Sequence, residues 1–156
     1  KPASSGHDSM ILFLEFDGVT HPRVGSSGFI DACMSSLKEA LKPFDIEIVV
    51  SSTWRLTCHS SELQKLLSPL GKPIVGVTPE LERGTDYKRQ KEIVSYISQN
   101  NITKWIAIDD SRFSFFPDQS QNVYFTNPKT GFTADDIAPL KELLSSSGKL
   151  SLSPWN

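Results

Sequence analysis

Short, continuous runs of apolar residues alternate along this chain with longer segments in which apolar positions recur at helical spacing. Uninterrupted apolar runs are typical of strands that are covered on both faces of a parallel sheet. Residues 11–14 form such a run, and the other strands are predicted at residues 46–50, 72–77, 104–108 and 122–126. The helical segments follow them, at residues 29–44, 60–70, 87–100 and 133–144. Strands that alternate with helices predict an α/β fold, a doubly wound, Rossmann-like sheet of five parallel strands with helices on both faces.

Local signals mark the ends of several of these helices. Pro43 ends the first helix, because its ring removes a backbone donor and clashes with the preceding turn. Ser61 and Gln64 have the spacing of a capping box in the second helix. Thr133 and Asp136 suit the start of the last helix, where a side-chain oxygen satisfies free backbone N–H groups.

The regular pattern covers one domain, which we place at residues 10–146. Residues 1–9 are polar and rich in serine, and we expect a disordered end or a remnant of recombinant expression there. Residues 147–156 are expected to form a loose tail. Within the domain, residues 20–29 contain proline and glycine and predict a loop, which we call the flap.

Composition and charge narrow the class of protein. The chain has 156 residues, of which 38% are hydrophobic and 22% charged, as in ordinary globular proteins. Its formal net charge is -2, so no basic field indicates binding to a nucleic acid or a membrane surface. No run of about 18 apolar residues predicts a membrane span, and the two cysteines do not make a disulfide framework. We therefore expect a cytoplasmic protein without a membrane partner.

Polar side chains gather where three of the predicted strands end. Glu15 and Asp17 follow the first strand, Ser51 follows the second, and Asp109 with Asp110 follows the fourth. In a doubly wound sheet the carboxyl ends of neighbouring strands meet in a crevice where the strand order reverses. Four carboxylates in one crevice need a cation, and oxygen ligands without histidine or cysteine select a hard ion, here Mg²⁺.

A phosphate group bound on such a magnesium ion also needs hydrogen-bond donors and a further positive charge. Ser51 and Ser52 offer hydroxyl and backbone N–H groups at the end of the second strand. Arg89, at the start of the third helix, is the best placed cation, with Lys88 and Lys91 as rivals. The residues themselves therefore predict a phosphate site that depends on magnesium.

Four motifs, LFLEFDGV, IVVSS, KRQKEI and WIAIDDS, resemble in content and order those of the haloacid dehalogenase (HAD) superfamily of phosphohydrolases. The resemblance extends over roughly residues 10–145. In the spacing of the motifs, the chain is similar to a small bacterial HAD-like subgroup with some members in RNA-repair contexts. The resemblance implies a phosphomonoesterase that works through a phosphoryl-enzyme.

The resemblance also implies a role for each motif. Glu15 takes the position of the nucleophile that attacks phosphorus. Asp17 takes that of the group that protonates the leaving oxygen and then activates water. Ser51 would bind the transferring phosphoryl group, and Arg89, or a neighbouring lysine, would neutralise its charge. The implied magnesium ligands come from the first and fourth motifs: Glu15, Asp17, Asp109 and Asp110.

One residue departs from the family pattern. The first motif of the superfamily is Asp-x-Asp, whereas this chain has Glu15 at the first position. The longer side chain shifts the carboxylate by about 1 Å, and a misplacement of that size costs roughly a hundredfold in rate. Glu15 is an engineered inactivating change, a natural degenerate position or a tolerated nucleophile. We expect it to impair or abolish turnover.

The connections between the motifs are too short for a folded cap domain. Asp17 and Ser51 are separated by the flap and one helix, and Ser51 and Arg89 by a helix, a strand and a loop. An open crevice favours a bulky phosphorylated substrate, such as a protein or the end of a nucleic acid, or a partner subunit that covers it. The oligomeric state does not follow from the sequence.

Two other functions remain open. The same crevice could bind phosphate groups, nucleotides or a partner protein without turnover. A third interpretation is a nucleic-acid-processing site, which predicts two metal ions and cleavage of phosphodiesters. Turnover that depends on Mg²⁺ and is lost in Asp17→Asn distinguishes the phosphomonoesterase from the binding module.

Several residues close to the motifs have less certain roles. His21 lies near the expected mouth of the crevice, although histidines in loops are commonly exposed. Trp54 is expected to pack, and Arg55 to contact phosphate or to pair with an acid. The phenylalanines of residues 113–116 form a stacking surface or, as we expect, a buried hydrophobic edge.

Overall fold

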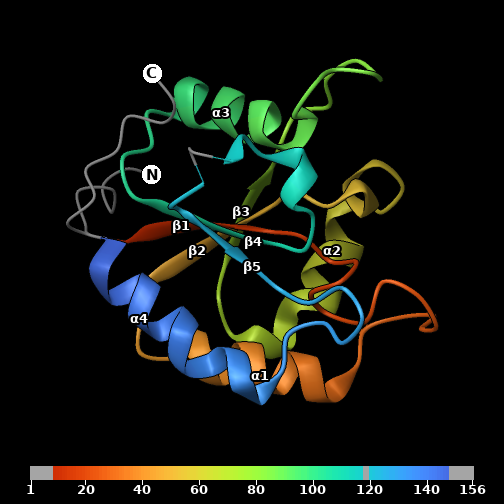
Figure 1. The fold of residues 1–156 in the computed structure, drawn as a ribbon, viewed down its shortest axis with the longest axis vertical. Coiled ribbons are helices and arrows are strands. Elements are labelled where there is room, and N and C mark those ends of the chain that lie inside the picture. Colours follow the sequence, from red (N-terminus) through yellow and green to blue (C-terminus); the bar gives the residue numbers. More distant parts are fainter. Residues whose placement is uncertain (1–8, 118–119, 148–156) are drawn as a thin grey trace.

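A parallel sheet flanked by helices is found in the computed structural model, which describes residues 9–117 and 120–147 (Figure 1). Its strands are β1 (Met10–Leu14), β2 (Ile46–Val50), β3 (Ile74–Val77), β4 (Trp105–Asp109) and β5 (Val123–Phe125). The α-helices of this part of the chain are α1 (Asp31–Leu41), α2 (Ser60–Leu67), α3 (Lys88–Asn100) and α4 (Ile137–Ser147). Short 3₁₀ turns are η2 (Thr53–Leu56), η3 (Ser68–Leu70), η4 (Arg112–Ser114) and η6 (Ala134–Asp136).

The strand order β3-β2-β1-β4-β5 makes β1 the central strand, and all neighbouring strands are parallel. Leu14, the last residue of β1, lies beside Val50 of β2 and Ile108 of β4. The chain runs outward from β1 on one side and returns to β4 and β5 on the other. The order therefore reverses at β1, and the predicted doubly wound sheet of five parallel strands is confirmed.

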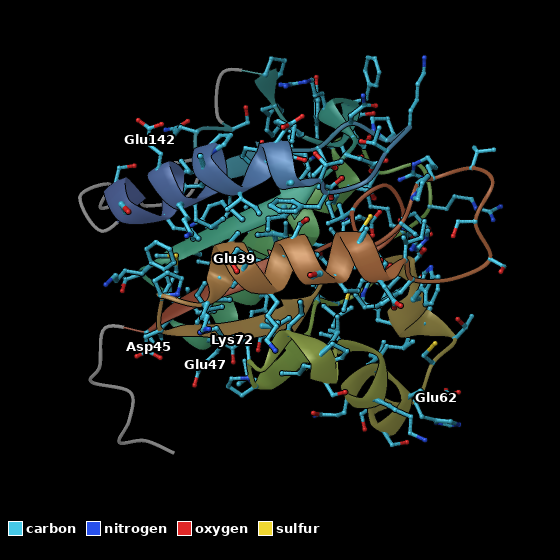
Figure 2. The ribbon with its side chains drawn as sticks, turned by 90° about the horizontal axis from the view of Figure 1, so that it is seen from below. Glu39, Asp45, Glu47, Glu62, Lys72 and Glu142 are labelled. Atoms are coloured by element: carbon cyan, nitrogen blue, oxygen red, sulfur yellow. The ribbon has the colours of Figure 1, made fainter. Side chains whose placement is uncertain are left out.

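Helices cover both faces of the sheet, as predicted. Figures 1 and 2 show α1 and α4 side by side on one face, and Figure 1 shows α3 on the other. Leu12 and Leu14 of β1 belong to the larger core, which includes residues of α1 and α4. Phe13 belongs to the smaller core with Ile93 of α3. Successive residues of the central strand are thus buried on opposite faces, which explains the uninterrupted apolar run.

The third strand differs from the prediction. We expected the third strand at residues 72–77, but β3 begins at Ile74 and its residues are alternately half-buried and exposed. β3 is the edge strand of the sheet, and Pro73 before it has no N–H for a ladder. Val75 and Val77 are consequently exposed. An apolar run in the sequence does not distinguish such an edge strand from a central one.

The predicted N-cap of α2 is wrong by two residues, although the helix begins at residue 60 as expected. We expected a capping box of Ser61 and Gln64, but α2 begins at Ser60 with His59 as the cap. The His59 backbone N–H donates to Glu62 Oε1 at 2.8 Å. Glu62 therefore takes the place in the box that we gave to Gln64.

The last helix agrees with the prediction. The Thr133 backbone N–H donates to Asp136 Oδ2 at 2.8 Å, which confirms this capping box, and α4 continues to Ser147. The disordered end and the loose tail were predicted at residues 1–9 and 147–156, and all but residues 9 and 147 of these lie outside the described residues, so the domain boundaries stay predictions. In the described part of the chain, no helix has the length and apolar character to cross a membrane.

Candidate active site

The carboxyl ends of β1, β2 and β4 bring the predicted polar residues into one region. Glu15 directly follows β1, and Ser51 follows β2, where its backbone N–H donates to Leu14 O at 3.1 Å. Asp109 is the last residue of β4, and Asp110 follows it. Because β2 and β4 flank β1, these residues converge at the point where the strand order reverses.

Glu15, Asp109 and Asp110 form a buried group that we call the acidic cluster. Each offers one carboxylate oxygen, and these oxygens lie within 4.8 Å of one another. All three residues are buried. Burial raises the pKa of Asp109, because the loss of solvation penalises its charged form more than the positive charge of Arg89 favours it. The protein alone therefore compensates the charge of the cluster only in part.

Arg89, near the start of α3, contacts two members of the acidic cluster. Its Nη1 lies 2.7 Å from Asp109 Oδ2 and 3.3 Å from Glu15 Oε2. Burial lowers the pKa of Arg89, but the charges of Glu15 and Asp109 more than offset this and raise it above its usual value. Of the two rivals, Lys91 is exposed, and Lys88 lines a smaller hollow of about 150 Å³ that also includes Arg89.

A second arginine, Arg23 of the flap, also reaches the acidic cluster. Its Nε and Nη2 donate to the two carboxylate oxygens of Asp110 at 2.7 and 2.8 Å, and Nη2 lies 3.5 Å from Glu15 Oε2. The hydrogen bond to Asp110 raises the pKa of Arg23. The sequence analysis missed this residue, because its partner is 87 positions away. Only its place in the loop after the first motif could have suggested it.

Asp17 lies beside the acidic cluster and is partly exposed. Its Oδ1 accepts hydrogen bonds from His21 Nε2 at 2.9 Å and from Trp54 Nε1 at 3.2 Å. His21 is buried, contrary to the exposure usual for a loop histidine, and its Nδ1 lies 2.9 Å from Thr20 Oγ1. Trp54 packs against the core, as expected, but also donates this bond. Asp17 is therefore held firmly through one of its two oxygens.

The two serines after β2 differ in what their hydroxyl groups do. Ser51 Oγ is buried and has no hydrogen-bond partner among the described residues. Ser52 Oγ accepts from the Trp54 backbone N–H at 3.2 Å and caps η2. Buried hydroxyl groups almost always have a partner. The Ser51 hydroxyl thus keeps its full capacity to bond to a ligand, whereas that of Ser52 is used within the fold.

Arg55 pairs with an acid, which was one of its two expected roles. Its Nη2 lies 3.2 Å from Glu92 Oε1, and both side chains are almost fully buried. The same guanidinium group donates to the backbone oxygens of Ser52 and Thr78 at 2.9 and 2.7 Å. Arg55 therefore supports the loop after β2.

Gly18 allows the loop after β1 to approach Asp110. Its φ is +81°, and a Cβ atom at this position would lie 2.1 Å from Asp110 Oδ2. Only glycine accommodates both the backbone conformation and the close approach. The Gly18 carbonyl also accepts a hydrogen bond from Thr126 Oγ1 at 2.6 Å. The Asp17-Gly18 pair is thus more than a local turn, because it holds the first motif against the fourth.

A cavity of about 720 Å³, which we call the acidic crevice, opens onto these groups. Its volume is within the range of about 300–1,000 Å³ typical of ligand pockets. Five predicted site residues line it: Glu15, Asp17, Arg89, Asp109 and Asp110. Of the described residues that we predicted to contact phosphate, three do not line it: Ser51, Ser52 and Lys91.

The donor set of the acidic crevice suits a hard divalent cation. The atoms that could act as ligands in the acidic cluster are carboxylate oxygens, which Mg²⁺ prefers. With Asp17, four carboxylates face two ion-paired arginines, so negative charge remains in excess. Burial is the largest cause of the raised pKa of Asp109, and the negative charges of Glu15 and Asp110 add to the rise. Glu15, Asp109 and Asp110 are therefore the residues that fit a metal ion, and Asp17 lies outside this group.

The sheet order and the acidic crevice define a small α/β domain of the HAD type. No folded cap domain covers the crevice within residues 9–117 and 120–147. The chain matches the family described as the HAD domain in Swiss Army Knife RNA repair proteins over residues 11–137, and it belongs to this family. The resemblance inferred from the four motifs is thus confirmed. A comparison with curated proteins gave no match.

Proposed function

We propose that this chain is a Mg²⁺-dependent phosphohydrolase that removes a terminal phosphate from a strand of RNA, and that Glu15 limits its rate. The proposal rests on the acidic cluster of Glu15, Asp109 and Asp110, whose oxygens lie within 4.8 Å of one another. Membership of the HAD family supports a phosphate-ester hydrolase in general, and the description of the family supports RNA as the substrate. The open crevice suits the end of a macromolecule.

The residues of the crevice can carry out the reaction in two steps. A Glu15 oxygen bonds to phosphorus as the bond from phosphorus to the leaving oxygen breaks, and Asp17 gives its proton to that oxygen. Asp17 then takes a proton from water, whose oxygen bonds to phosphorus as the bond from Glu15 to phosphorus breaks. Inorganic phosphate is released, and Glu15 and Asp17 return to their starting states.

The charged groups around Glu15 stabilise the transferring phosphoryl group. Arg89 and Arg23 lie beside the Glu15 carboxylate and can donate to the phosphoryl oxygens. We further propose Ser51 as a donor, because its hydroxyl has no partner among the described residues, although it is buried and does not line the crevice. Mg²⁺ held by Glu15, Asp109 and Asp110 would supply positive charge that offsets the negative charge of the phosphate.

The contacts of Glu15 support a slow nucleophile. Its Oε1 accepts a hydrogen bond from the backbone N–H of Phe16 at 3.0 Å. Its Oε2 lies 3.3 Å from Arg89 Nη1 and 3.5 Å from Arg23 Nη2. Each of these three contacts draws electron density from the carboxylate, so together they lower its nucleophilicity.

The test is Mg²⁺-dependent phosphate release from an oligoribonucleotide with a 5′- or a 3′-phosphate, with a simple aryl phosphate in parallel. We expect little turnover by the chain itself and a rate roughly a hundredfold higher in Glu15→Asp. Asp17→Asn should show no turnover. Glu39→Asp is the matched control, because Glu39 is exposed on α1 (Figure 2). Phosphodiester cleavage, or no turnover by Glu15→Asp on any of these substrates, would contradict the proposal.

A binding module without turnover is the second candidate function. The observation that favours it is the engagement of both Glu15 oxygens, by Phe16 and by the two arginines. In that case the phosphorylated oligonucleotide binds to the chain and to Glu15→Asp with similar affinity, and neither releases phosphate.

A further inference from the structure

Phe113 is the most exposed of the large hydrophobic residues in the described ranges, with 93% of its surface accessible. We expected the phenylalanines of residues 113–116 to form a buried edge, and only Phe115 does so. Phe116 is half-buried, and its ring stacks on Tyr87 with 4.1 Å between centroids. The expectation of a buried edge is therefore wrong for Phe113.

The backbone that carries Phe113 is held in place on several sides. The Ser111 backbone N–H donates to Asp109 Oδ1 at 2.9 Å, and the Ser111 and Ser114 hydroxyl oxygens are 3.1 Å apart. The ring of Phe115 packs edge-on against Phe125 with 5.6 Å between centroids. The exposed ring thus projects from a turn that is tied directly to the acidic cluster. Because its backbone is already fixed, Phe113 has only its own side-chain rotamer freedom to lose when it binds a ligand.

Phe113 also lies between two hollows of the surface. It lines the acidic crevice and, together with Arg112, a second hollow of about 350 Å³. We call this second hollow the rim hollow, and it is lined by Asp86, Tyr87, Arg112, Phe113, Phe115 and Pro117. A ligand that extends out of the crevice past Phe113 therefore enters the rim hollow.

The two hollows differ in chemistry in a way that matches the two parts of a nucleotide. The acidic crevice holds the arginines and the metal-ligating carboxylates that suit a phosphate. Four of the six residues that line the rim hollow are aromatic residues or proline, and Asp86 adds an acceptor that suits a base amino group better than a phosphate. Arg112, whose guanidinium carbon lies 4.4 Å from the centroid of the Phe125 ring, adds a positive charge where the two hollows meet. Single-stranded RNA is typically bound by such a combination of aromatic rings and cationic groups.

We propose that Phe113 is a stacking platform for the base next to the terminal phosphate of a single-stranded RNA, with the phosphate in the acidic crevice and the base in the rim hollow. This inference rests on the proposed function, because it takes the occupant of the crevice to be a phosphorylated RNA end. It makes Phe113 a residue that determines specificity for nucleotides over small phosphate esters.

The test compares Phe113→Ala, Phe113→Trp and the control Val75→Ala, which shortens an exposed apolar residue on the edge strand. The probes are short oligoribonucleotides with a 5′- or a 3′-phosphate, followed by fluorescence anisotropy in the presence of Mg²⁺. Loss of one stacked base weakens binding by about 5- to 150-fold. For Phe113→Ala we expect this loss with one of the two probes, the 5′- or the 3′-phosphorylated oligonucleotide. We expect full affinity for Phe113→Trp and no change for Val75→Ala. Competition by inorganic phosphate should keep the same inhibition constant in all of them.

An oligonucleotide that lacks its terminal base identifies the partner of the ring. Removal of that base should weaken binding to the chain as much as Phe113→Ala does, and it should cause no further loss in Phe113→Ala. The inference would be overturned if removal of the base weakened binding to Phe113→Ala by a further factor as large as for the unsubstituted chain. It would also be overturned if the affinity of Phe113→Ala for the intact probe lay within twofold of that of the unsubstituted chain. The same dependence on Phe113 for a phosphopeptide would also overturn it.

The failures of the two proposals can be told apart. Phosphate release from RNA that is the same with and without the Phe113 ring leaves the phosphohydrolase in place and refutes the stacking platform. Binding that depends on Phe113 without phosphate release by Glu15→Asp supports the platform and refutes the phosphohydrolase.

Discussion

Replacement of Arg89 by methionine tests whether the acidic crevice is held together by charge balance. Arg89 Nη1 lies 2.7 Å from Asp109 Oδ2 and 3.3 Å from Glu15 Oε2. Methionine keeps much of the apolar stem of arginine but removes the guanidinium group. The substitution therefore leaves two buried carboxylates without their nearest positive charge.

The expected loss of stability is large for one substitution. The side chain of Arg89 is 13% exposed, and those of Asp109 and Glu15 are 1% and 5% exposed, so the ion pairs are buried. Removal of one partner of a buried ion pair costs about 3–5 kcal/mol. We expect about 3 kcal/mol, because protonation of the carboxylates relieves part of the cost. For a chain of this size, that corresponds to a fall of roughly 6–12 °C in melting temperature.

The loss should depend on pH when no metal is added. Burial raises the pKa of Asp109 in the folded chain above its value in the unfolded chain. A carboxyl group with a raised pKa contributes stability that is complete below its unfolded pKa and is lost as pH rises through its folded pKa. Without Arg89 the folded pKa rises further. The difference in unfolding free energy between the chain and Arg89→Met should therefore be larger at pH 8 than at pH 5.

Urea denaturation followed by circular dichroism, at pH 5 and 8 with EDTA or with Mg²⁺, measures these differences. Arg83→Met is the matched control, because Arg83 is exposed in the loop before α3. Mg²⁺ should restore part of the stability of Arg89→Met, since it supplies the missing positive charge. A loss below about 1 kcal/mol at pH 8 would refute the argument, because a loss that small is typical of an exposed ion pair. So would a loss that is independent of both pH and Mg²⁺.

Three further substitutions test other contacts of the crevice. Gly18→Ala forces a Cβ atom to within 2.1 Å of Asp110 Oδ2 at a positive φ, so thermal unfolding should show a loss of about 2 kcal/mol or more; Gly28→Ala, with nothing within 4 Å, should show no such loss. Arg23→Ala frees both oxygens of Asp110, so titration calorimetry should find tighter Mg²⁺ binding. Weaker Mg²⁺ binding would contradict the idea that Arg23 competes with the metal ion for Asp110. Ser51→Ala should weaken inhibition by phosphate but leave the melting temperature unchanged or higher, because its Oγ has no partner among the described residues; a lower melting temperature would argue for a structural bond instead.

The sheet and the convergence of its polar ends could be predicted because both follow from periodic patterns. The apolar run of β1 required cover on two faces, and a parallel sheet brings the carboxyl ends of its strands to one edge. Glu15 and Asp109 are therefore close in space although they are far apart in sequence. The edge position of β3 could not be predicted in the same way. Its composition resembles that of a buried strand, and only the strand order exposes Val75 and Val77.

The parts of the site that escaped prediction depend on contacts between distant segments. Arg23 and His21 belong to a flap without regular structure, and their roles arise from Asp110 and Asp17. The choice between Arg89 and Lys91 depends on the phase of α3, because residues two positions apart on a helix point in different directions. The apolar positions of α3 set which face meets the sheet, but they do not fix how far each cation of the first turn reaches into the crevice.

Glu15 links the rate of the proposed reaction to the charge balance of the crevice. Its Oε2 lies 3.3 Å from Arg89 and 3.5 Å from Arg23, so one carboxylate joins an arginine of α3 to an arginine of the flap. An aspartate would withdraw this oxygen by roughly one carbon–carbon bond, which lengthens both contacts and frees the oxygen for attack. The same change leaves each arginine with a single carboxylate, Asp109 or Asp110. We therefore expect the longer side chain to favour an arginine-bridged crevice and the shorter one to favour turnover.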